Sequence, residues 1–429
     1  MNIAWYYSIV HGGILKDSDV ITNKNVLRDK NSRLITVIPD SVYFYSAIGI
    51  LEETDNLYLN IMLIGWIEQS TTMPSLKCCL TYPDQNIVST AGNIKIRKHY
   101  EYKYNQTITG AVVEIYCPIS HQRNRPTTAT LLPGEQTCDV NSTFLEIEYP
   151  VHHIGGLALC AQAIFNYFDP LRLIEWFEIQ KLLGVDMVVM VTVEGLNKEA
   201  VDVLEYYRST GYAHPYPYRT RQPSKSSGWD LVPSYISEQH AFNSYCWHTM
   251  KGYTYGSFLD IDEVIVPKNK GTLKNLMVEL EKNQRTGSVT FDQKFFPMDS
   301  DSYPMSSGLT TFAKYRYATN PMRVAYKTMY ITNRTAGVNG PHFSDNKKGF
   351  RRIWSRDTYF NHYRNCPVTT AEIKKRFEPI CRIENLHYDG EILTYLPDVN
   401  AAIVKLRNER PDLFVTENTE NTNNSRQKY

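Results

Sequence analysis

The sequence has no long hydrophobic run and little net charge, and both absences restrict its function. The longest apolar stretch, residues 59–67, falls short of the roughly 18 residues that a membrane-spanning helix needs. Residues 1–10 are apolar but lack the charged region and the small-residue cleavage site of a signal peptide. The formal net charge of +1 favours neither a nucleic acid nor an anionic membrane as partner. We expect a chain that reaches a membrane only through an anchor absent from this sequence.

Cysteine is present, but not in the spacing of a metal or redox site. No two of the eight cysteines form a Cys-x-x-Cys pair, which argues against zinc binding and thioredoxin-like chemistry. The even number of cysteines and four Asn-x-Ser/Thr acceptors favour an oxidising secretory compartment, although the sequence does not reveal which cysteines pair. The acceptors, which should lie in surface loops of a luminal protein, are Asn105, Asn141, Asn333 and Asn423.

The composition is that of an ordinary globular protein. With 42% hydrophobic and 21% charged residues, a chain of 429 residues can bury large cores in about two to three domains. Tyrosine is unusually frequent at 31 copies. Tyrosine rings suit the faces of sugars, but they also fill β-rich cores, and we favour the core explanation.

The first third of the chain has the pattern of a β-rich domain. Residues 1–33 show no sustained period and form an entry segment. In residues 34–150, short β-type runs are separated by turn residues, which predicts a small β-sandwich-like domain. The expected strands are 42–50, 57–66, 76–82, 87–88, 111–116 and 144–149.

Residues 151–412 alternate between strand and helix patterns, which predicts βαβ organisation. Asp169 and Pro170 cap the first helix, and Gly184 ends it. The expected strands are 157–165, 186–193, 258–261, 288–296 and 323–331, and the expected helices are 170–183, 198–209, 235–250, 272–283 and 369–377. We therefore expect an α/β domain with a mostly parallel sheet flanked by helices, followed by a disordered tail over residues 413–429.

The most informative motif is an Asp-x-Asp pair, Asp260 and Asp262, with Glu263 directly after it. On an extended segment both aspartates would point one way, while Ile261 would point into the core. Carboxylates that share a small space repel each other, so the arrangement suits a divalent cation such as Mg²⁺ or Mn²⁺. Open α/β sheets bind ligands at such carboxyl strand ends, where an ion would clamp a diphosphate. The alternative is that both residues are solvated aspartates at a turn. The apolar stretches on both sides of the motif argue against this alternative.

Four blocks of sequence carry a resemblance to a known family. They are residues 173–186 (Leu-Ile-Glu-Trp-Phe-Glu-Ile-Gln-Lys-Leu-Leu-Gly-Val-Asp), Glu238-Gln239 with Asn243 and Cys246, the Asp-x-Asp stretch 256–267, and Asn361-His362-Tyr363-Arg364. In order and spacing these blocks resemble glycosyltransferase family 92, over roughly residues 155–380. The resemblance implies a GT-A-like fold, a UDP-sugar donor (usually UDP-galactose), Mn²⁺, inversion at the anomeric carbon, and a type II membrane protein of the Golgi.

The resemblance also assigns roles to individual residues. Asp260 and Asp262 match the metal motif of the family, and His362 and Arg364 match its His-Tyr-Arg block. An imidazole beside carboxylates suits Mn²⁺, and an arginine can pair with a leaving diphosphate through its fork of donors. His342, in Gly-Pro-His-Phe, is the competing imidazole ligand.

Further residues are candidates for binding the donor nucleotide. Gln239 and Asn243 are four residues apart on one helical face, where they would contact the nucleotide or belong to an ordinary hydrogen-bonded helix surface. Cys246 matches a family cysteine and is better explained as a disulfide partner than as a nucleophile. The chain departs from the family at Ala161-Gln162-Ala163, where members often carry a small Ser-Pro element.

Inversion requires a carboxylate that takes the proton of the acceptor hydroxyl. Asp299 and Asp301 are the preferred candidates, ahead of Asp292 and Asp345, and solvated loop acids are the alternative for each of them. Two rival functions remain open. A haloacid-dehalogenase-like phosphatase would use the first Asp of the motif as a nucleophile, and a non-catalytic lectin would bind a glycan through the tyrosines and the β domain.

Overall fold

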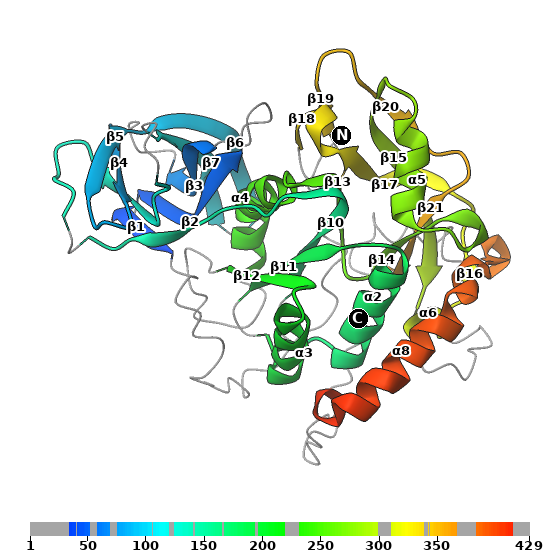
Figure 1. Cartoon of the computed structure of the whole chain (residues 1–429). Helices are drawn as coiled ribbons and strands as arrows, with labels where there is room; N and C mark the ends of the chain where they lie inside the picture. The colour runs from blue at the N-terminus through cyan, green and yellow to red at the C-terminus, as the bar shows by residue number, and fades with distance from the viewer. Residues whose placement is uncertain are drawn as a thin grey trace.

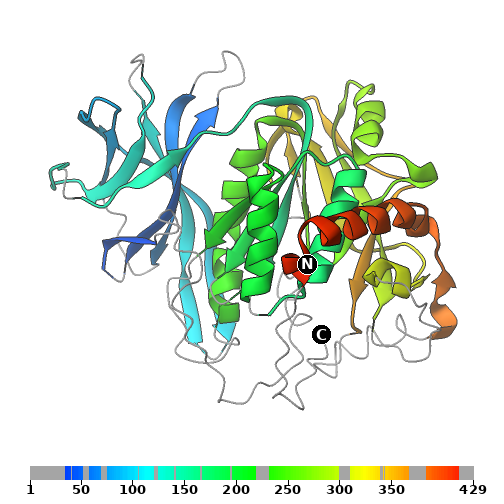
Figure 2. The same cartoon turned by 60° about the horizontal axis from the view of Figure 1, so that its bottom comes forward.

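The chain folds into a mixed α/β structure with two large sheets (Figure 1). In this computed structural model the described residues are 34–39, 41–51, 58–68, 75–104, 106–119, 124–139, 142–164, 167–193, 196–218, 231–298, 310–338, 342, 344–366 and 383–414. The first sheet curls into a near-closed β-barrel, and the second is a mixed, curled sheet with helices packed against it. Figure 2 shows the blue and cyan barrel strands beside the green helices, with the red helix α8 lying across the second sheet.

The barrel consists of one continuous sheet with the strand order β5-β4-β8-β9-β2-β3-β7-β6, and β1 pairs with β2. Its strands are β1 (Ile35–Ile38), β2 (Val42–Leu51), β3 (Tyr58–Glu68), β4 (Leu76–Thr81), β5 (Ile87–Ala91), β6 (Asn93–Tyr104), β7 (Gln106–Pro118), β8 (Thr128–Pro133) and β9 (Leu145–Glu148). The prediction of a β-rich region is confirmed, but the sandwich form is wrong. The short strand β9 hydrogen-bonds to β8 on one side and to β2 on the other. The strands therefore form one continuous sheet and not the two facing sheets of a sandwich.

Disulfide bonds cross-link segments of the barrel and also involve a strand of the second sheet. The Cys78–Cys117 bond joins β4 to β7, which are not neighbours in the strand order, so it links distant parts of the curled sheet. Cys79 bonds to Cys138, and Cys160 of the second sheet bonds to Cys246, as the interpretation of Cys246 as a disulfide partner predicted. Cys366 is also disulfide-bonded, and no cysteine in the described ranges carries a free thiol. This pattern favours an oxidising compartment.

The second sheet has the strand order β12-β11-β10-β13-β17-β15-β21-β14, and β20 pairs with β15. Its strands are β10 (His153–Ile164), β11 (Met187–Val193), β12 (Ala213–Tyr218), β13 (Tyr253–Leu259), β14 (Glu263–Val266), β15 (Thr286–Pro297), β17 (Met322–Ile331), β20 (Arg351–Trp354) and β21 (Tyr359–Arg364). Strands β10 to β13 are parallel, as predicted. The other half is mixed, because β17 runs antiparallel to β13 and β15, and β14 runs antiparallel to β21. A helix follows each of β10, β11 and β12 in the chain, as parallel neighbours joined by crossovers require.

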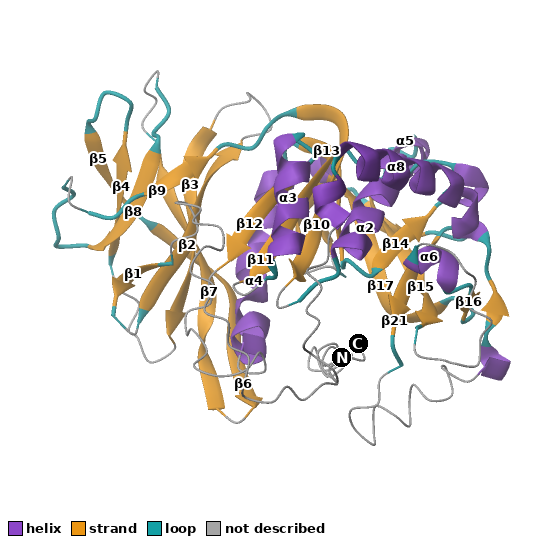
Figure 3. Cartoon of the chain, turned by 90° about the horizontal axis from the view of Figure 1, so that it is seen from below, coloured by secondary structure: helices purple, strands orange, loops and turns teal. Residues whose placement is uncertain are grey.

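Most helices lie on one face of the second sheet, while α4 lies on the other, between that sheet and the barrel (Figure 3). The helices are α2 (Pro170–Leu182), α3 (Lys198–Ser209), α4 (Leu231–Met250), α5 (Leu273–Glu281), α6 (Thr311–Lys314) and α8 (Leu396–Glu409). The Asp169 carboxylate accepts a hydrogen bond from the Leu171 backbone N–H, and Gly184 follows with a positive φ of 84°, so both predicted ends of α2 are confirmed. The predicted helix 369–377 and the tail from residue 415 lie outside the described residues. Among the described helices, none has the length and apolarity needed to cross a bilayer.

The barrel and the second sheet share a hydrophobic core around α4. Tyr45 and Trp66 of the barrel and Phe242 of α4 belong to one buried cluster that also includes β10, β11 and β13. A buried carboxylate adds a polar contact, because Glu114 of β7, which is fully buried, accepts hydrogen bonds from Ser244 of α4 and from Tyr116. Helix α4 therefore packs against both sheets at once.

One of the four N-glycosylation acceptors, Asn333, lies in the described part of the chain. Asn333 is exposed in the short 3-10 helix η2 (Thr332–Arg334), as expected for a surface acceptor, whereas the other three acceptors lie outside the described residues. Thr332 donates a hydrogen bond to the backbone carbonyl of Tyr253, the first residue of β13, so Asn333 lies at the opposite end of β13 from the Asp-x-Asp pair. For chains produced through a secretory pathway, we expect Asn333→Gln to remove one glycan, seen as a mass difference that glycosidase treatment abolishes. Any catalytic activity should stay unchanged, and an identical mass would contradict the prediction.

Candidate functional site

The Asp-x-Asp pair lies in the turn that connects β13 to β14. The Glu263 N–H donates to the Asp260 carbonyl over 3.0 Å, and the Asp260 N–H donates to Oε2 of Glu263 over 2.9 Å. The expectation of an extended segment is therefore wrong. Strand β14 pairs with β21 at the far end of the sheet rather than with the neighbours of β13, so the chain must turn at these residues. Ile261 nevertheless packs against the core, as the sequence indicated.

Three side chains in this region could hold a metal ion. One donor atom from each of Asp262, Glu263 and His362 lies within 4.8 Å of the other two. Glu263 and His362 face each other in the register of β14 and β21, and Nε2 of His362 lies 3.3 Å from Oδ2 of Asp262. Two carboxylates and an imidazole make a donor set that suits Mn²⁺, so the residues present fit the implied cofactor.

Gln293 of β15 fixes the orientation of the candidate ligand His362. Its side-chain amide lies 2.8 Å from Nδ1 of the imidazole. Nε2 of Gln293 donates to Nδ1, so the proton of the neutral imidazole is on Nε2 and faces Oδ2 of Asp262. A metal ion bound at Nε2 would replace that proton. Sequence analysis missed Gln293, because only the pairing of β15 with β21 brings it to His362.

A buried lysine occupies the other side of the acidic cluster. Nζ of Lys327, on β17, lies 2.9 Å from Oδ2 of Asp260 and 2.6 Å from Oε2 of Glu263. The Lys327 side chain is 0% exposed. Sequence analysis missed this residue, although a lone lysine in the strand pattern of 322–331 was an available signal. The structure therefore places an ammonium group, in addition to any metal ion, next to the Asp-x-Asp pair.

The charges in the cluster shift its protonation equilibria. Burial works to raise the pKa of the Asp262 carboxyl, but His362, Arg364 and Arg172 hold that pKa well below its usual range. Burial, aided by the charge of Asp260, raises the pKa of Glu263 to about 7 against the opposing effect of Lys327. Burial also works to lower the pKa of Lys327, but its two carboxylate partners raise it above the usual value, so the lysine stays charged.

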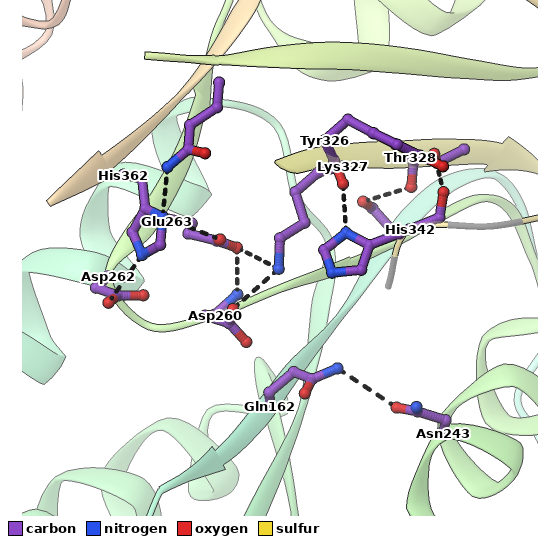
Figure 4. Close-up of polar contacts among 12 residues, drawn as sticks. Gln162, Asn243, Asp260, Asp262, Glu263, Tyr326, Lys327, Thr328, His342 and His362 are labelled. Carbon is purple, nitrogen blue, oxygen red and sulfur yellow. Dashed lines mark hydrogen bonds and ion pairs between the residues drawn. The ribbon is translucent and has the colours of Figure 1, made fainter. Parts of the chain in front are cut away.

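His342 lies apart from the candidate metal ligands. It is on the other side of Lys327 from His362, and its Nδ1 faces the backbone carbonyl of Tyr326 at 2.5 Å (Figure 4). Burial and the charge of Lys327 lower the pKa of His342 to about 4, so its imidazole is neutral at physiological pH. The group of candidate metal ligands found in the described residues does not include it.

Three amide side chains line the neighbouring strand end. Nε2 of Gln239 donates to Oε1 of Gln162 over 2.6 Å, and Nε2 of Gln162 donates to Oδ1 of Asn243 over 3.5 Å. Ala161 pairs with Leu259 in the parallel register of β10 and β13, so the next residues, Gln162 within β10 and Asp260 just after β13, lie at the same level. In Figure 4, Gln162 lies below Asp260, and a dashed line joins Gln162 to Asn243. The two helical residues thus share a face, as predicted, and Gln162 joins them.

Among the remaining candidates, Arg364, Asp292 and Asp345 lie on strands that the structure describes. Arg364 ends β21, two residues after His362. Of the candidate bases, Asp299 and Asp301 lie outside the described residues. Asp292 pairs with Arg323 at 3.3 Å, and Asp345 is exposed on β19 (Ser344–Asn346), which pairs with β18 (Thr335–Val338).

One of the comparisons with known proteins identifies a family. The sequence profile of glycosyltransferase family 92 matches residues 155–400. No curated protein matches the chain. Among solved structures, purple acid phosphatase PPD1 from yellow lupin (Lupinus luteus) seeds is similar over 75% of this chain and 77% of that one, with 9% identity. Its TM-score of 0.20 is too low to carry an argument about fold or function.

Proposed function

Because the chain belongs to glycosyltransferase family 92, we propose that it is a metal-dependent inverting enzyme that transfers a hexose from a UDP-sugar to a glycan acceptor. Galactose is the hexose we propose first. In this proposal the second sheet is a GT-A-like fold, and the donor binds at the carboxyl ends of β10 and β13. The observation that carries the proposal is the Asp262, Glu263 and His362 group beside the Asp-x-Asp turn.

In the proposed site, Asp262, Glu263 and His362 would hold Mn²⁺, which would supply positive charge near the departing diphosphate. Arg364 pairs with a diphosphate oxygen through its guanidinium group, and Asp260 accepts a hydrogen bond from the donor. The amides of Gln239 and Asn243 contact the nucleotide, a role that suits groups able both to donate and to accept hydrogen bonds.

The acceptor hydroxyl must lose a proton as the new glycosidic bond forms. A carboxylate within about 3 Å of that hydroxyl, on the face of the sugar opposite the diphosphate, would take the proton. We retain Asp299 and Asp301 as the proposed bases, since they follow β15 directly in the chain. Asp292, which is on β15 itself, is the second choice.

A screen of donors tests this function. We expect the chain to release UDP from UDP-galactose faster than from UDP-glucose or UDP-N-acetyl sugars, and to lose this activity in chelator. Added Mn²⁺ should restore it. Glycan binding without any donor turnover would instead indicate a lectin, and release of inorganic phosphate would indicate a phosphatase.

The disulfide bonds support a site of action in the secretory pathway. The bonds Cys78–Cys117, Cys79–Cys138 and Cys160–Cys246 need an oxidising compartment to form and persist. We propose the Golgi lumen, with the full-length form a type II membrane protein.

A further inference from the structure

Two aromatic side chains lie over the same face of strand β15. The rings of Tyr326 on β17 and Trp354 on β20 are 5.3 Å apart and meet edge to face. In the strand register Tyr326 pairs with Asp292, and Trp354 pairs with Thr290, two residues of β15 whose side chains point to one face. Both aromatic side chains are half-buried, so each ring is held in place and keeps an accessible part. We refer to Tyr326 and Trp354 as the ring pair.

Two exposed arginines lie against the ring pair. The guanidinium carbon of Arg323 is 4.7 Å from the centre of the Trp354 ring. That of Arg352 is 5.7 Å from the Tyr326 ring and 5.8 Å from the Trp354 ring. Such contacts hold a guanidinium group beside a ring while exposed N–H donors still face solvent. Arg323 bonds to Asp292 through Nε, which leaves its terminal N–H groups for a ligand.

Positive charge is concentrated around the ring pair. Residues 347–356 contain five basic side chains and no acidic one, although the formal net charge of the whole chain is only +1. Arg351, Arg352 and Arg356 are exposed, and none of the ion pairs found among the described residues involves them. Asp357, which follows this segment, pairs with a lysine outside it. Exposed charge of one sign that is not neutralised nearby attracts an anionic ligand.

The ring pair adjoins the candidate site through His342. The ring of His342 is 5.8 Å from that of Tyr326. The charge of Lys327, the residue after Tyr326, helps to lower the pKa of the same imidazole, and the charge of Asp260 opposes it. A ligand on the ring pair would therefore lie near the acidic cluster, within the reach of an oligosaccharide.

We propose that the ring pair, Arg323 and Arg352 bind an acidic sugar, one that carries a carboxylate or a sulfate group. The apolar face of the sugar packs on the rings, and the arginines pair with its anionic group through their N–H donors. An anionic membrane fits less well, because neither ring is among the large apolar side chains that the described part of the chain exposes. Resting on the proposed function, acidic glycans are then the acceptor class.

Binding of defined oligosaccharides, in chelator and without donor, tests the site. The probes are a hyaluronan hexasaccharide and the same hexasaccharide with its carboxyl groups reduced to alcohols. We expect the acidic form to bind about tenfold or more tightly than the reduced form, because only the acidic form gives the arginines an anionic partner. A chondroitin hexasaccharide with and without its sulfate groups shows whether sulfate is recognised in addition to carboxylate. Equal binding of the acidic and neutral forms in both pairs would overturn the inference.

Single substitutions assign the binding to these side chains. Arg352→Gln should weaken binding of the acidic hexasaccharide about tenfold and bring it close to that of the reduced form. Trp354→Ala should weaken both forms about tenfold, since it removes the packing surface. Arg407→Gln is the matched control, because exposed Arg407 lies 4.9 Å from the Phe414 ring on α8, away from β15, and it should bind like wild type. Should Trp354→Ala fail to fold, Arg352→Gln and Arg323→Gln, which change exposed side chains, still decide.

The remaining outcomes separate this inference from the proposed function. Unchanged binding by Arg352→Gln and Arg323→Gln would overturn the inference and leave the arginines a structural role. Binding to vesicles of phosphatidylcholine and phosphatidylserine that Arg352→Gln abolishes, without binding of either hexasaccharide, would identify a membrane surface instead. Turnover of UDP-galactose without any preference for acidic oligosaccharides would sink the inference and leave the proposed function intact. Arginine-dependent binding of the acidic hexasaccharide by a chain that turns over no UDP-sugar would support the acidic-sugar site and refute the proposed function.

Discussion

Asp262→Asn is expected to lower transferase turnover by about 100-fold or more while the chain stays folded. The substitution removes one of the two carboxylates in the candidate metal group and leaves a weak amide ligand. The amide oxygen can still accept the hydrogen bond that Nε2 of His362 makes to Asp262. Loss of the charge that His362 and Arg364 stabilise should lower the free energy of unfolding by about 1.5–3 kcal/mol, which leaves the chain folded. The measurements are initial rates with UDP-galactose and Mn²⁺, and a denaturant titration.

A matched control separates this effect from a general response to losing a carboxylate. Asp357 is exposed, and it pairs with Lys268 at 3.2 Å on the surface, where such pairs contribute little. We expect Asp357→Asn to retain the wild-type rate. If Asp262→Asn also keeps a rate within about threefold of wild type, a difference of well under 1 kcal/mol in the barrier, the proposed metal site is wrong.

Sequence patterns predicted the elements whose signals are local. The helix α3 runs over the predicted residues, and α2 begins and ends at the predicted cap and glycine. Strand β6 and helix α8 were not predicted. The polar composition of β6 weakens its β signal, and α8 has only four buried positions against the core. Near-closure of the barrel could not be predicted either, because it depends on pairing between strands that are distant in the chain.

The candidate site was only partly accessible from sequence for the same reason. The sequence separates Asp262 from His362 by a hundred residues, and only the family resemblance connected them before the register of β14 and β21 placed them together. Lys327 had no motif around it, and its role depends on the pairing of β17 with β13 and β15. Gln162 was noted only as a departure from the family, yet it bonds to both predicted amides. Local patterns thus identify candidates, and strand register decides which of them meet.

Removal of the barrel is expected to prevent the rest of the chain from folding. Tyr45 and Trp66 of the barrel are buried in the same cluster as Phe242 and Tyr245 of α4, and the rings of Tyr45 and Tyr218 lie 5.0 Å apart. A chain of residues 151–429 would expose these apolar surfaces. Each large side chain contributes roughly 1.5–3 kcal/mol when buried, so five or more of them amount to about 10 kcal/mol. That is as large as the whole stability of a typical domain, about 5–15 kcal/mol.

The comparison to make is between residues 151–429 and residues 34–429, which lack only the entry segment. We expect the longer chain to elute as a compact species with a cooperative thermal transition, and the shorter one to aggregate or to lack a transition. Trp66→Ala in the longer chain should be destabilising by about 3–5 kcal/mol, since the side chain is fully buried against both parts. A soluble, cooperatively melting, UDP-binding chain of residues 151–429 would show instead that the boundary near residue 150 separates two independent domains. We expect residues 151–429 alone not to fold, because α4, which carries Gln239 and Asn243, packs against the barrel on one side and the second sheet on the other.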